Sequence, residues 1–137
     1  MFLNSIFRYI TLLLILFFIV PAFTQENWHY SADELEQVTI NGESARKFKN
    51  NVKIYRKSTQ LLTDNAIQLV SQKMLILKGN TIMIENLDTL SCDSMYYWTL
   101  LDSGFAMGNI KFIQPFKNRQ IFTDVLHYWK TDGYRGS

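Results

Sequence analysis

Apolar and polar side chains alternate one by one along much of the chain beyond residue 50. The stretch 52–55 reads Val-Lys-Ile-Tyr, and the stretch 110–113 reads Ile-Lys-Phe-Ile. A period of two places successive side chains on opposite faces of an extended strand. The β-branched and aromatic residues of these stretches suit a pleated, half-buried surface. The pattern therefore predicts an all-β protein.

A helix is the alternative for one segment. Residues 31–38 fit a capping box that runs from Ser31 to Glu34. The corresponding stretches further along the chain, 62–69 and 122–129, have the composition of strands. We therefore expect a strand in this segment as well.

A unit of about 30 residues recurs along the chain. Each unit begins with a turn that contains asparagine, and an apolar strand follows it. A small residue and an aspartate come next, and a second apolar strand follows them. The asparagines are spaced by 29 and 29 residues, and the aspartates by 31, 29 and 31. Glycine and asparagine tolerate the positive φ of a tight turn, so a strand should start after each turn. The recurring residues are Asn51, Asn80 and Asn109, and Asp33, Asp64, Asp93 and Asp124.

The parity of the apolar positions changes at each aspartate. Leu61 and Thr63 occupy odd positions before Asp64, whereas Ala66 and Gln68 occupy even positions after it. A β-bulge or a corner switches the face in this way. We predict a structural bend at each of the four aspartates, with the carboxylate hydrogen-bonded to nearby backbone amides. A row of cation ligands is the alternative, but calcium-binding repeats have denser acidic and glycine positions.

The N-terminus has the layout of a secretory signal peptide. Arg8 supplies positive charge, residues 9–20 form an apolar run of 12, and small residues follow. Spanning a bilayer takes about 20 apolar residues. We expect residues 1–24 to be a cleaved signal peptide and residues 25–137 to form one periplasmic domain. A retained inner-membrane anchor is the alternative.

Charge and cysteine content argue against several function classes. The chain has 14 basic and 12 acidic residues, a net charge of +2, which makes no electrostatic case for nucleic acid. Cys92 is the single cysteine, so no internal disulfide can form. It takes the position that Thr63 and Thr123 have in other copies, which favours a packed thiol.

An enzyme is not expected. A reactive Cys92 would need a neighbouring base and an orienting group. The two histidines, His29 and His127, stand at loosely equivalent strand positions. The sequence has no phosphate-binding loop, no metal-ligand spacing and no nucleophile elbow. We therefore expect no catalytic residue, no metal and no cofactor.

These interleaved motifs resemble those of the OstA-like (LptA) family, the organic-solvent-tolerance proteins of lipopolysaccharide transport. The family repeats Ala-Asp and Gly-Asn-Val, each followed by alternating apolar positions. The chain departs from this pattern at Thr63 and Cys92, which precede aspartate, and at Asn50, which replaces glycine. The matching stretches span Trp28 to Trp129 and read SADELE, NNVKI, LLTDNAIQL, GNTIMI, LSCDSMYYW, GNIKF and IFTDVLHYW.

The resemblance implies a twisted, open β-jellyroll of two facing antiparallel sheets. Family members hold the acyl chains of lipopolysaccharide in an apolar groove between the sheets and stack end to end through edge strands. The expected function is a periplasmic bridge module in outer-membrane biogenesis. The expected partners are lipopolysaccharide or a related glycolipid, other β-jellyroll transport proteins, and a second copy that pairs with the C-terminal strand 121–129.

The alternation also gives candidates for the lining of the groove. An ordinary core position is the alternative for each of them. Lys53 and Lys111 alternate with these candidates and should point outward. Like Lys47, Lys49 and Lys117, they could bind lipid phosphates through charge-assisted hydrogen bonds. The alternative is that all five are solvated surface charges. The lipid-groove candidates are Val52, Ile54, Leu61, Met83, Leu90, Met95, Ile110, Phe112, Ile121 and Leu126.

Two other functions stay open. A structural β-solenoid or adhesion module would have a filled core and no ligand. The N-terminal periplasmic domain of a larger outer-membrane assembly barrel would share the fold. The sequence continues for eight residues after Trp129, where family repeats normally enter another strand, so we expect either a short member or a fragment.

Overall fold

The computed structural model describes residues 27–131 and 133–134. The predicted signal peptide, residues 1–24, lies outside the described residues. In the described part, no helix is long and apolar enough to cross a membrane. The elements are β1 (His29–Ser31), β2 (Glu34–Ile40), β3 (Glu43–Arg56), β4 (Thr59–Leu69), β5 (Met74–Glu85), β6 (Asp88–Trp98), β7 (Ser103–Gln114), the 3-10 helix η1 (Pro115–Lys117), β8 (Arg119–Thr131) and β9 (Gly133–Tyr134).

The strands form an antiparallel sheet in the order β1-β3-β4-β5-β6-β7-β8-β9. The strand β2 pairs with the first part of β3, and β1 pairs with its last part. From β2 onward, neighbours along the chain are neighbours in the sheet, as expected for a row of hairpins. This confirms the all-β prediction, including a strand rather than a helix over Glu34–Ile40.

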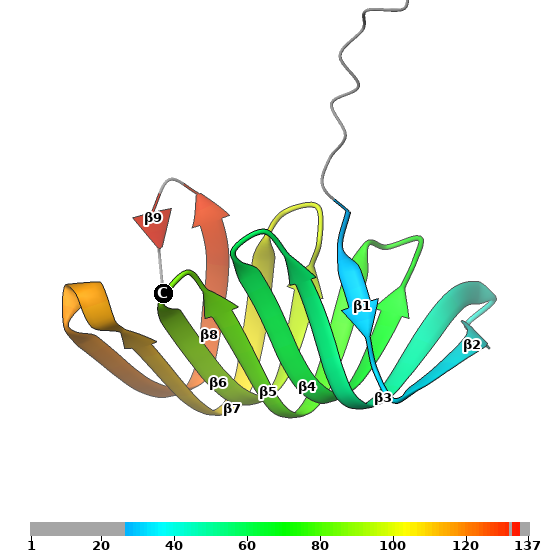
Figure 1. Cartoon of the computed structure of the whole chain (residues 1–137), viewed down its shortest axis with the longest axis horizontal. Helices are drawn as coiled ribbons and strands as arrows, with labels where there is room; N and C mark the ends of the chain where they lie inside the picture. Colours follow the sequence, from blue (N-terminus) through cyan, green and yellow to red (C-terminus); the bar gives the residue numbers. More distant parts are fainter. Residues whose placement is uncertain (1–26, 132, 135–137) are drawn as a thin grey trace, which may run out of the picture.

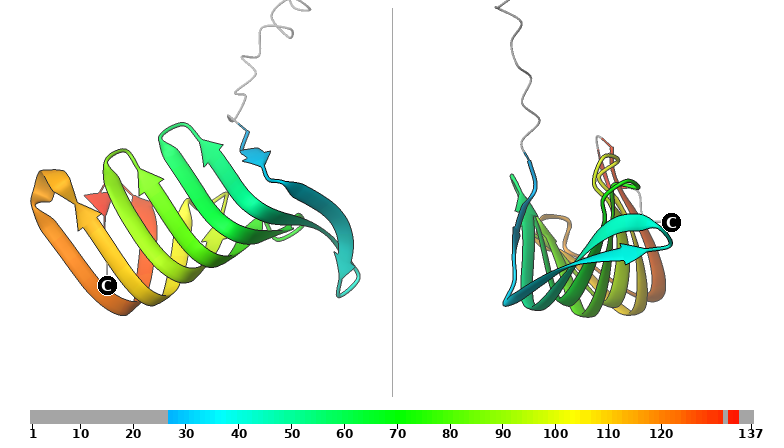
Figure 2. Two further views of the ribbon diagram at one scale, coloured as in Figure 1. Left: turned by 60° about the horizontal axis from the view of Figure 1, so that its bottom comes forward. Right: turned by 90° about the vertical axis from the view of Figure 1, so that its right-hand side faces the viewer.

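Each long strand bends near its middle, so that the sheet folds over on itself into a trough (Figures 1 and 2). The line of bends is called the crest, and the opposite side, where the hairpin turns lie, is called the mouth. The two facing layers of the predicted jellyroll are thus two halves of one sheet. Wall A contains residues 29–31, 52–56, 59–63, 81–85, 88–92, 110–114 and 119–123, and wall B contains residues 34–40, 43–49, 65–69, 74–78, 94–98, 103–107 and 125–131.

The bends coincide with two-residue bulges in alternate strands. The pairs Asn50–Asn51, Gly79–Asn80 and Gly108–Asn109 have positive φ and lie where the pairing register shifts. An extra residue in one strand bends it and increases its twist. The bend predicted at the aspartates is therefore made by an extra residue in the asparagine-bearing strand next to each of them.

The core lies between the walls. Because the bends line up, alternate side chains of both halves point into the same interior. Leu61 and Leu90 of wall A and Leu75 and Met95 of wall B have no exposed surface. The register of the hairpins therefore brings residues of both walls into one hydrophobic cluster.

Candidate functional site

The structure brings all ten lipid-groove candidates together on the inner face of the trough. Nine of them are buried members of the central cluster, and Ile121 packs against it while half-buried. These ten residues therefore lie on one face of the folded sheet. Their walls differ, because Met95 and Leu126 reach the interior from wall B and the other eight from wall A.

The interior is tightly packed. Ile54, Leu61 and Leu90 are completely buried, and Phe112 and Leu126 are only 5% exposed. Side chains of the two walls fill the space between them in this conformation. An aliphatic ligand can therefore enter the interior only if the walls move apart.

Sequence reasoning missed several inner residues of wall B. Leu75 and Leu77 are fully buried, and Tyr97 is 1% exposed. Their signal was present, because Leu75 and Leu77 stand four and two positions before the Gly79–Asn80 bulge. Ala106 stands two positions before the next bulge and is equally buried. The alternation of inner and outer positions thus continues into the segment before each bulge. The sequence indicated Leu75, Leu77 and Ala106 in this way, but none of the predicted groove residues was taken from those segments.

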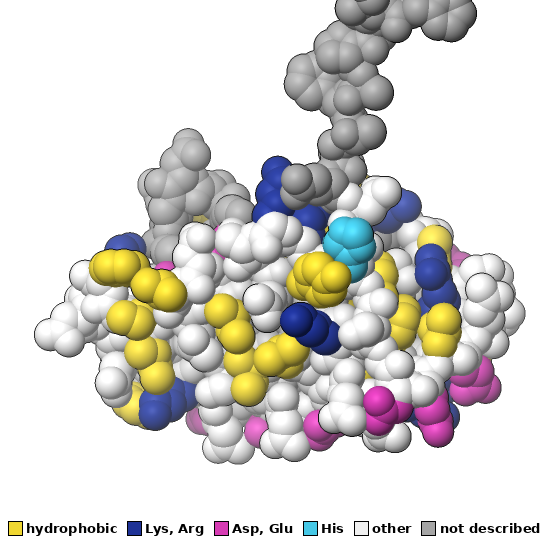
Figure 3. Space-filling view, in the orientation of Figure 1, with side chains coloured by type: hydrophobic (Ala, Val, Ile, Leu, Met, Phe, Trp, Pro, Cys, Tyr) yellow, Lys and Arg dark blue, Asp and Glu magenta, His cyan; other side chains and the backbone are white. Residues whose placement is uncertain are grey.

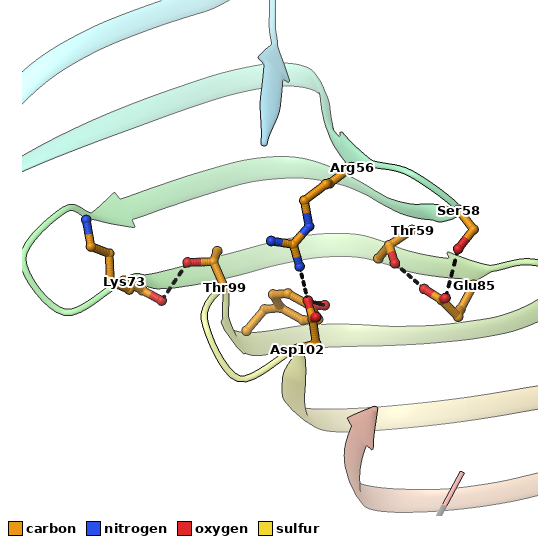
Figure 4. A network of polar contacts seen from close by, with 8 residues as sticks. Arg56, Ser58, Thr59, Lys73, Glu85, Thr99 and Asp102 are labelled. Atoms are coloured by element: carbon orange, nitrogen blue, oxygen red, sulfur yellow. Dashed lines mark hydrogen bonds and ion pairs between the residues drawn. The ribbon is translucent and has the colours of Figure 1, made fainter. Parts of the chain in front are cut away.

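An ion pair joins the walls across the mouth. Arg56 ends β3 on wall A, and its guanidinium contacts the carboxylate of Asp102, which lies in the turn after β6 on wall B (Figure 4). The Arg56 guanidinium also lies 4.5 Å from the ring centre of Trp28. The Tyr97 hydroxyl donates to the same carboxylate at 3.3 Å. The mouth is thus bridged by a network rather than by one contact.

Residues next to and in β1 add further contacts between the walls. The ring of Trp28 meets Tyr97 edge-on at 5.5 Å, and Tyr30 stacks on Phe48 at 5.3 Å. The Gln68 amide donates to the Tyr30 hydroxyl at 3.1 Å. Burial raises the pKa of Tyr30 above its ordinary value, so the hydroxyl stays protonated. Trp28 and Tyr30 therefore connect the two walls at the first edge of the sheet.

A second group of polar side chains lies at the mouth end of wall A. Glu85 is 3% exposed and accepts hydrogen bonds from the hydroxyls of Ser58 and Thr59 (Figure 4). Burial, and then the nearby Asp102 carboxylate, raises the pKa of Tyr97. Burial, and then the nearby Glu85 carboxylate, raises the pKa of Tyr128. The hydrogen-bonded Glu85 carboxylate and Tyr97 hydroxyl end the apolar interior on the mouth side.

The crest carries a ladder of asparagine–aspartate pairs. The side-chain amides of Asn51, Asn80 and Asn109 donate to Asp33, Asp64 and Asp93 at 2.8, 2.8 and 2.9 Å. Backbone amides were predicted as the donors to these carboxylates, and this was wrong: for these three, the donors found are side-chain amides of the next bulge. Asp124 occupies the fourth position. No cluster of three or more possible metal ligands occurs among the described residues.

Cys92 lies inside the bend at Asp93. It is 6% exposed, and burial and then the neighbouring Asp93 carboxylate raise the pKa of its thiol to about 12. The corresponding Thr63 is also buried, and its hydroxyl contacts the backbone of the facing bulge at Gly79. The position thus takes a small side chain that packs under the bulge.

The histidines and the two alternating lysines lie on the outer surface. His29 stacks on Tyr55 at 5.1 Å, and His127 meets Phe105 edge-on at 4.9 Å. Lys53 and Lys111 are exposed and point away from the interior, as predicted. Figure 3 shows apolar side chains spread over the visible outer face and acidic side chains gathered along its lower margin.

A cleft of about 640 Å³ opens beside the β2–β3 hairpin. Its lining mixes apolar side chains with polar groups from both strands of the hairpin. The lining residues are Gln37, Val38, Thr39, Ser44, Ala45, Arg46 and Val70. It lies at one end of wall B, apart from the central cluster.

Comparison of the chain with protein-family models and with curated proteins found no match.

Proposed function

We propose that this chain is a lipid-carrier module of the lipopolysaccharide-transport type, which shields acyl chains between wall A and wall B. The continuous apolar inner face, supplied by both walls of one folded sheet, carries the proposal. An aliphatic chain offers no directional groups. An apolar surface whose backbone is hydrogen-bonded within a sheet is therefore a suitable site. The sequence resemblance to the OstA-like family supports the same assignment.

Burial of an acyl chain is the proposed source of the binding free energy. At about 0.8 kcal/mol per buried CH₂, even part of a chain of roughly twelve carbons contributes several kcal/mol. The lipid must replace contacts that the walls now make with each other, which lowers the net gain. A carrier also has to release its cargo, so moderate affinity suits the task.

The mouth is the proposed route of entry. At the crest the walls are joined by the backbone of each long strand. At the mouth they meet through side chains, such as Arg56 with Asp102 and Gln68 with Tyr30. Side-chain contacts can be broken without disrupting the backbone pairing of the sheet. Parting of the walls about the crest would thus expose the inner face.

The cellular setting is part of the same proposal. Export by residues 1–24 would place the trough in the periplasm. The edge of β8 would join it to an added strand of another transport protein. A free-standing carrier and the N-terminal domain of a larger outer-membrane assembly barrel would use the trough in the same way.

Photo-crosslinking from the interior tests lipid binding. A photoreactive amino acid replaces Met83 or Phe112, and the delipidated protein is illuminated with purified lipopolysaccharide. Ile82 is the matched control, because it neighbours Met83 but lies half-buried on the opposite face of the same strand. We expect lipid adducts from Met83 and Phe112 and far fewer from Ile82.

A structural module without a ligand is the second candidate. The observation that favours it is the dense packing of the inner face, where most of the groove candidates are at most 5% exposed. It predicts no lipid adduct from either interior position in a protein that circular dichroism shows to be folded. That result would exclude the carrier function.

A further inference from the structure

Among the residues that the structure describes, no strand covers most of the outer edge of β8. On one side β8 pairs with β7 from Arg119 to Trp129. On the other side, among the described residues, it pairs with β9 only at Lys130 and Thr131. Phe122 and Val125 are 67% and 51% exposed along this stretch. An open edge of this kind offers unpaired backbone groups to an added strand.

The asparagine–aspartate pairs of the crest show which kind of strand lies next to the equivalent aspartate-bearing segments within the sheet. Each aspartate stands on a chain segment that runs from wall A to wall B, and the next strand in the sheet supplies the asparagine. That asparagine is the second residue of a left-handed bulge, after Asn50, Gly79 or Gly108. The same contact occurs at Asp33, Asp64 and Asp93, the three places where the described part of the next strand reaches the crest.

Asp124 is the fourth aspartate of this series. It lies beside the Gly108–Asn109 bulge of β7 on one side, as Asp93 lies beside the bulge of β5. Asn109, however, donates to Asp93 and not to Asp124. Among the described residues, no side-chain amide donates to the Asp124 carboxylate. Asp124 is also exposed, so the carboxylate is accessible from the open edge.

We propose that the β8 edge recognises an antiparallel strand with a Gly-Asn or Asn-Asn bulge, whose asparagine donates a hydrogen bond to Asp124. The pairing of β9 with the end of β8 is already antiparallel. The contact fixes the register, since a slip by one residue removes the amide from the carboxylate. This inference names the partner of the edge pairing in the proposed function and is independent of lipid binding.

The N-terminal edge of a second copy, formed by β1 and β2, is not an antiparallel strand with an asparagine-bearing bulge. The segment from β1 to β2 runs from wall A to wall B, as β8 does, and a head-to-tail stack would therefore pair the two in parallel. That segment carries Asp33 at the crest, so two carboxylates would approach each other. Like charges opposite each other destabilise a strand pair. The edge therefore selects an asparagine-bearing strand over the first strand of another copy.

A peptide copied from β7 tests the proposal. Residues 103–114 contain the Gly108–Asn109 bulge, and in the fold this strand donates to Asp93. A fluorescent peptide of this sequence with a solubilising lysine tail is titrated into the full chain and followed by anisotropy. We expect binding, and we expect Asn109→Asp in the peptide to weaken it at least about tenfold, through loss of a charge-assisted bond and added repulsion.

Exchanging the aspartate and asparagine between protein and peptide distinguishes specific recognition from non-specific binding. Asp124→Asn in the protein should weaken binding of the natural peptide and restore binding of the Asn109→Asp peptide. A photoreactive residue in place of Val125 should crosslink to the peptide and so place it on β8. Absence of binding, equal affinity for both peptides, or no crosslink at Val125 would each overturn the proposal. None of these results affects the lipid test at Met83 and Phe112.

Discussion

Arg56 and Asp102 stand 46 residues apart in the chain and form an ion pair across the mouth of the trough. Their side chains are 20% and 28% exposed. The pair is thus shielded from solvent more than an ordinary surface pair. Together with Trp28 and Tyr97 it holds wall A against wall B at the side opposite the crest.

Asp102→Asn should destabilise the protein by about 1–2 kcal/mol, between the values for exposed and for buried pairs. Lys49→Gln is the matched control, since Lys49 pairs with Glu36 at 3.7 Å with both side chains about half exposed. The control should cost no more than about 0.5 kcal/mol. Urea unfolding measures both. Equal losses would mean that the mouth pair contributes no more than a surface contact.

Gly79→Ala should be more costly than Gly42→Ala. Both glycines have positive φ, so each substitution carries a backbone penalty of about 1 kcal/mol. A Cβ at Gly42 meets nothing within 4 Å, whereas one at Gly79 would lie 2.7 Å from a carboxylate oxygen of Asp64. The clash should add roughly 1–3 kcal/mol. Thermal and urea unfolding of the two variants compare them, and similar losses would argue against tight packing at the crest.

Leu61→Ala should destabilise the protein far more than Leu62→Ala. Leu61 is fully buried in the interior, and its neighbour Leu62 is half-buried on the outer face. Removal of a buried leucine side chain costs about 2–5 kcal/mol, whereas an outer position should cost about 1 kcal/mol. The unfolding free energies of the two variants test the assignment of faces. A larger loss at Leu62 would reverse it.

The native Cys92 thiol should react slowly with iodoacetamide at pH 8 and quickly in urea. Its pKa is about 12 in the folded chain and 9.0 ordinarily, so the folded state disfavours the thiolate. The stabilisation is complete below pH 9 and is lost as the pH rises from 9 toward 12. The unfolding free energy of Cys92→Ala should therefore fall less steeply over that range than that of the natural chain. Parallel curves, or rapid native alkylation, would contradict this.

The repeat predicted more of the fold than of the candidate site. The parity switch at Asp64 and the Gly79–Asn80 turn are local features, and they placed the bends to within a residue or two. The donors to the aspartates were predicted as backbone amides, because the sequence does not show that Asn80 lies on the strand next to Asp64. Leu75 and Leu77 were omitted because only the strand after each turn was considered, although they have the same odd parity as Thr81 and Met83 after the bulge.

The sequence by itself determined the strands, the period of about 30 residues and the face on which the apolar side chains lie. These follow from alternation and from the backbone preferences of glycine and asparagine, which act over a few residues. Only the tertiary structure decided that the two layers belong to one sheet, that their side chains fill the interior, and that Arg56 meets Asp102. Such contacts form when the folded sheet brings distant segments together, so no local pattern specifies them.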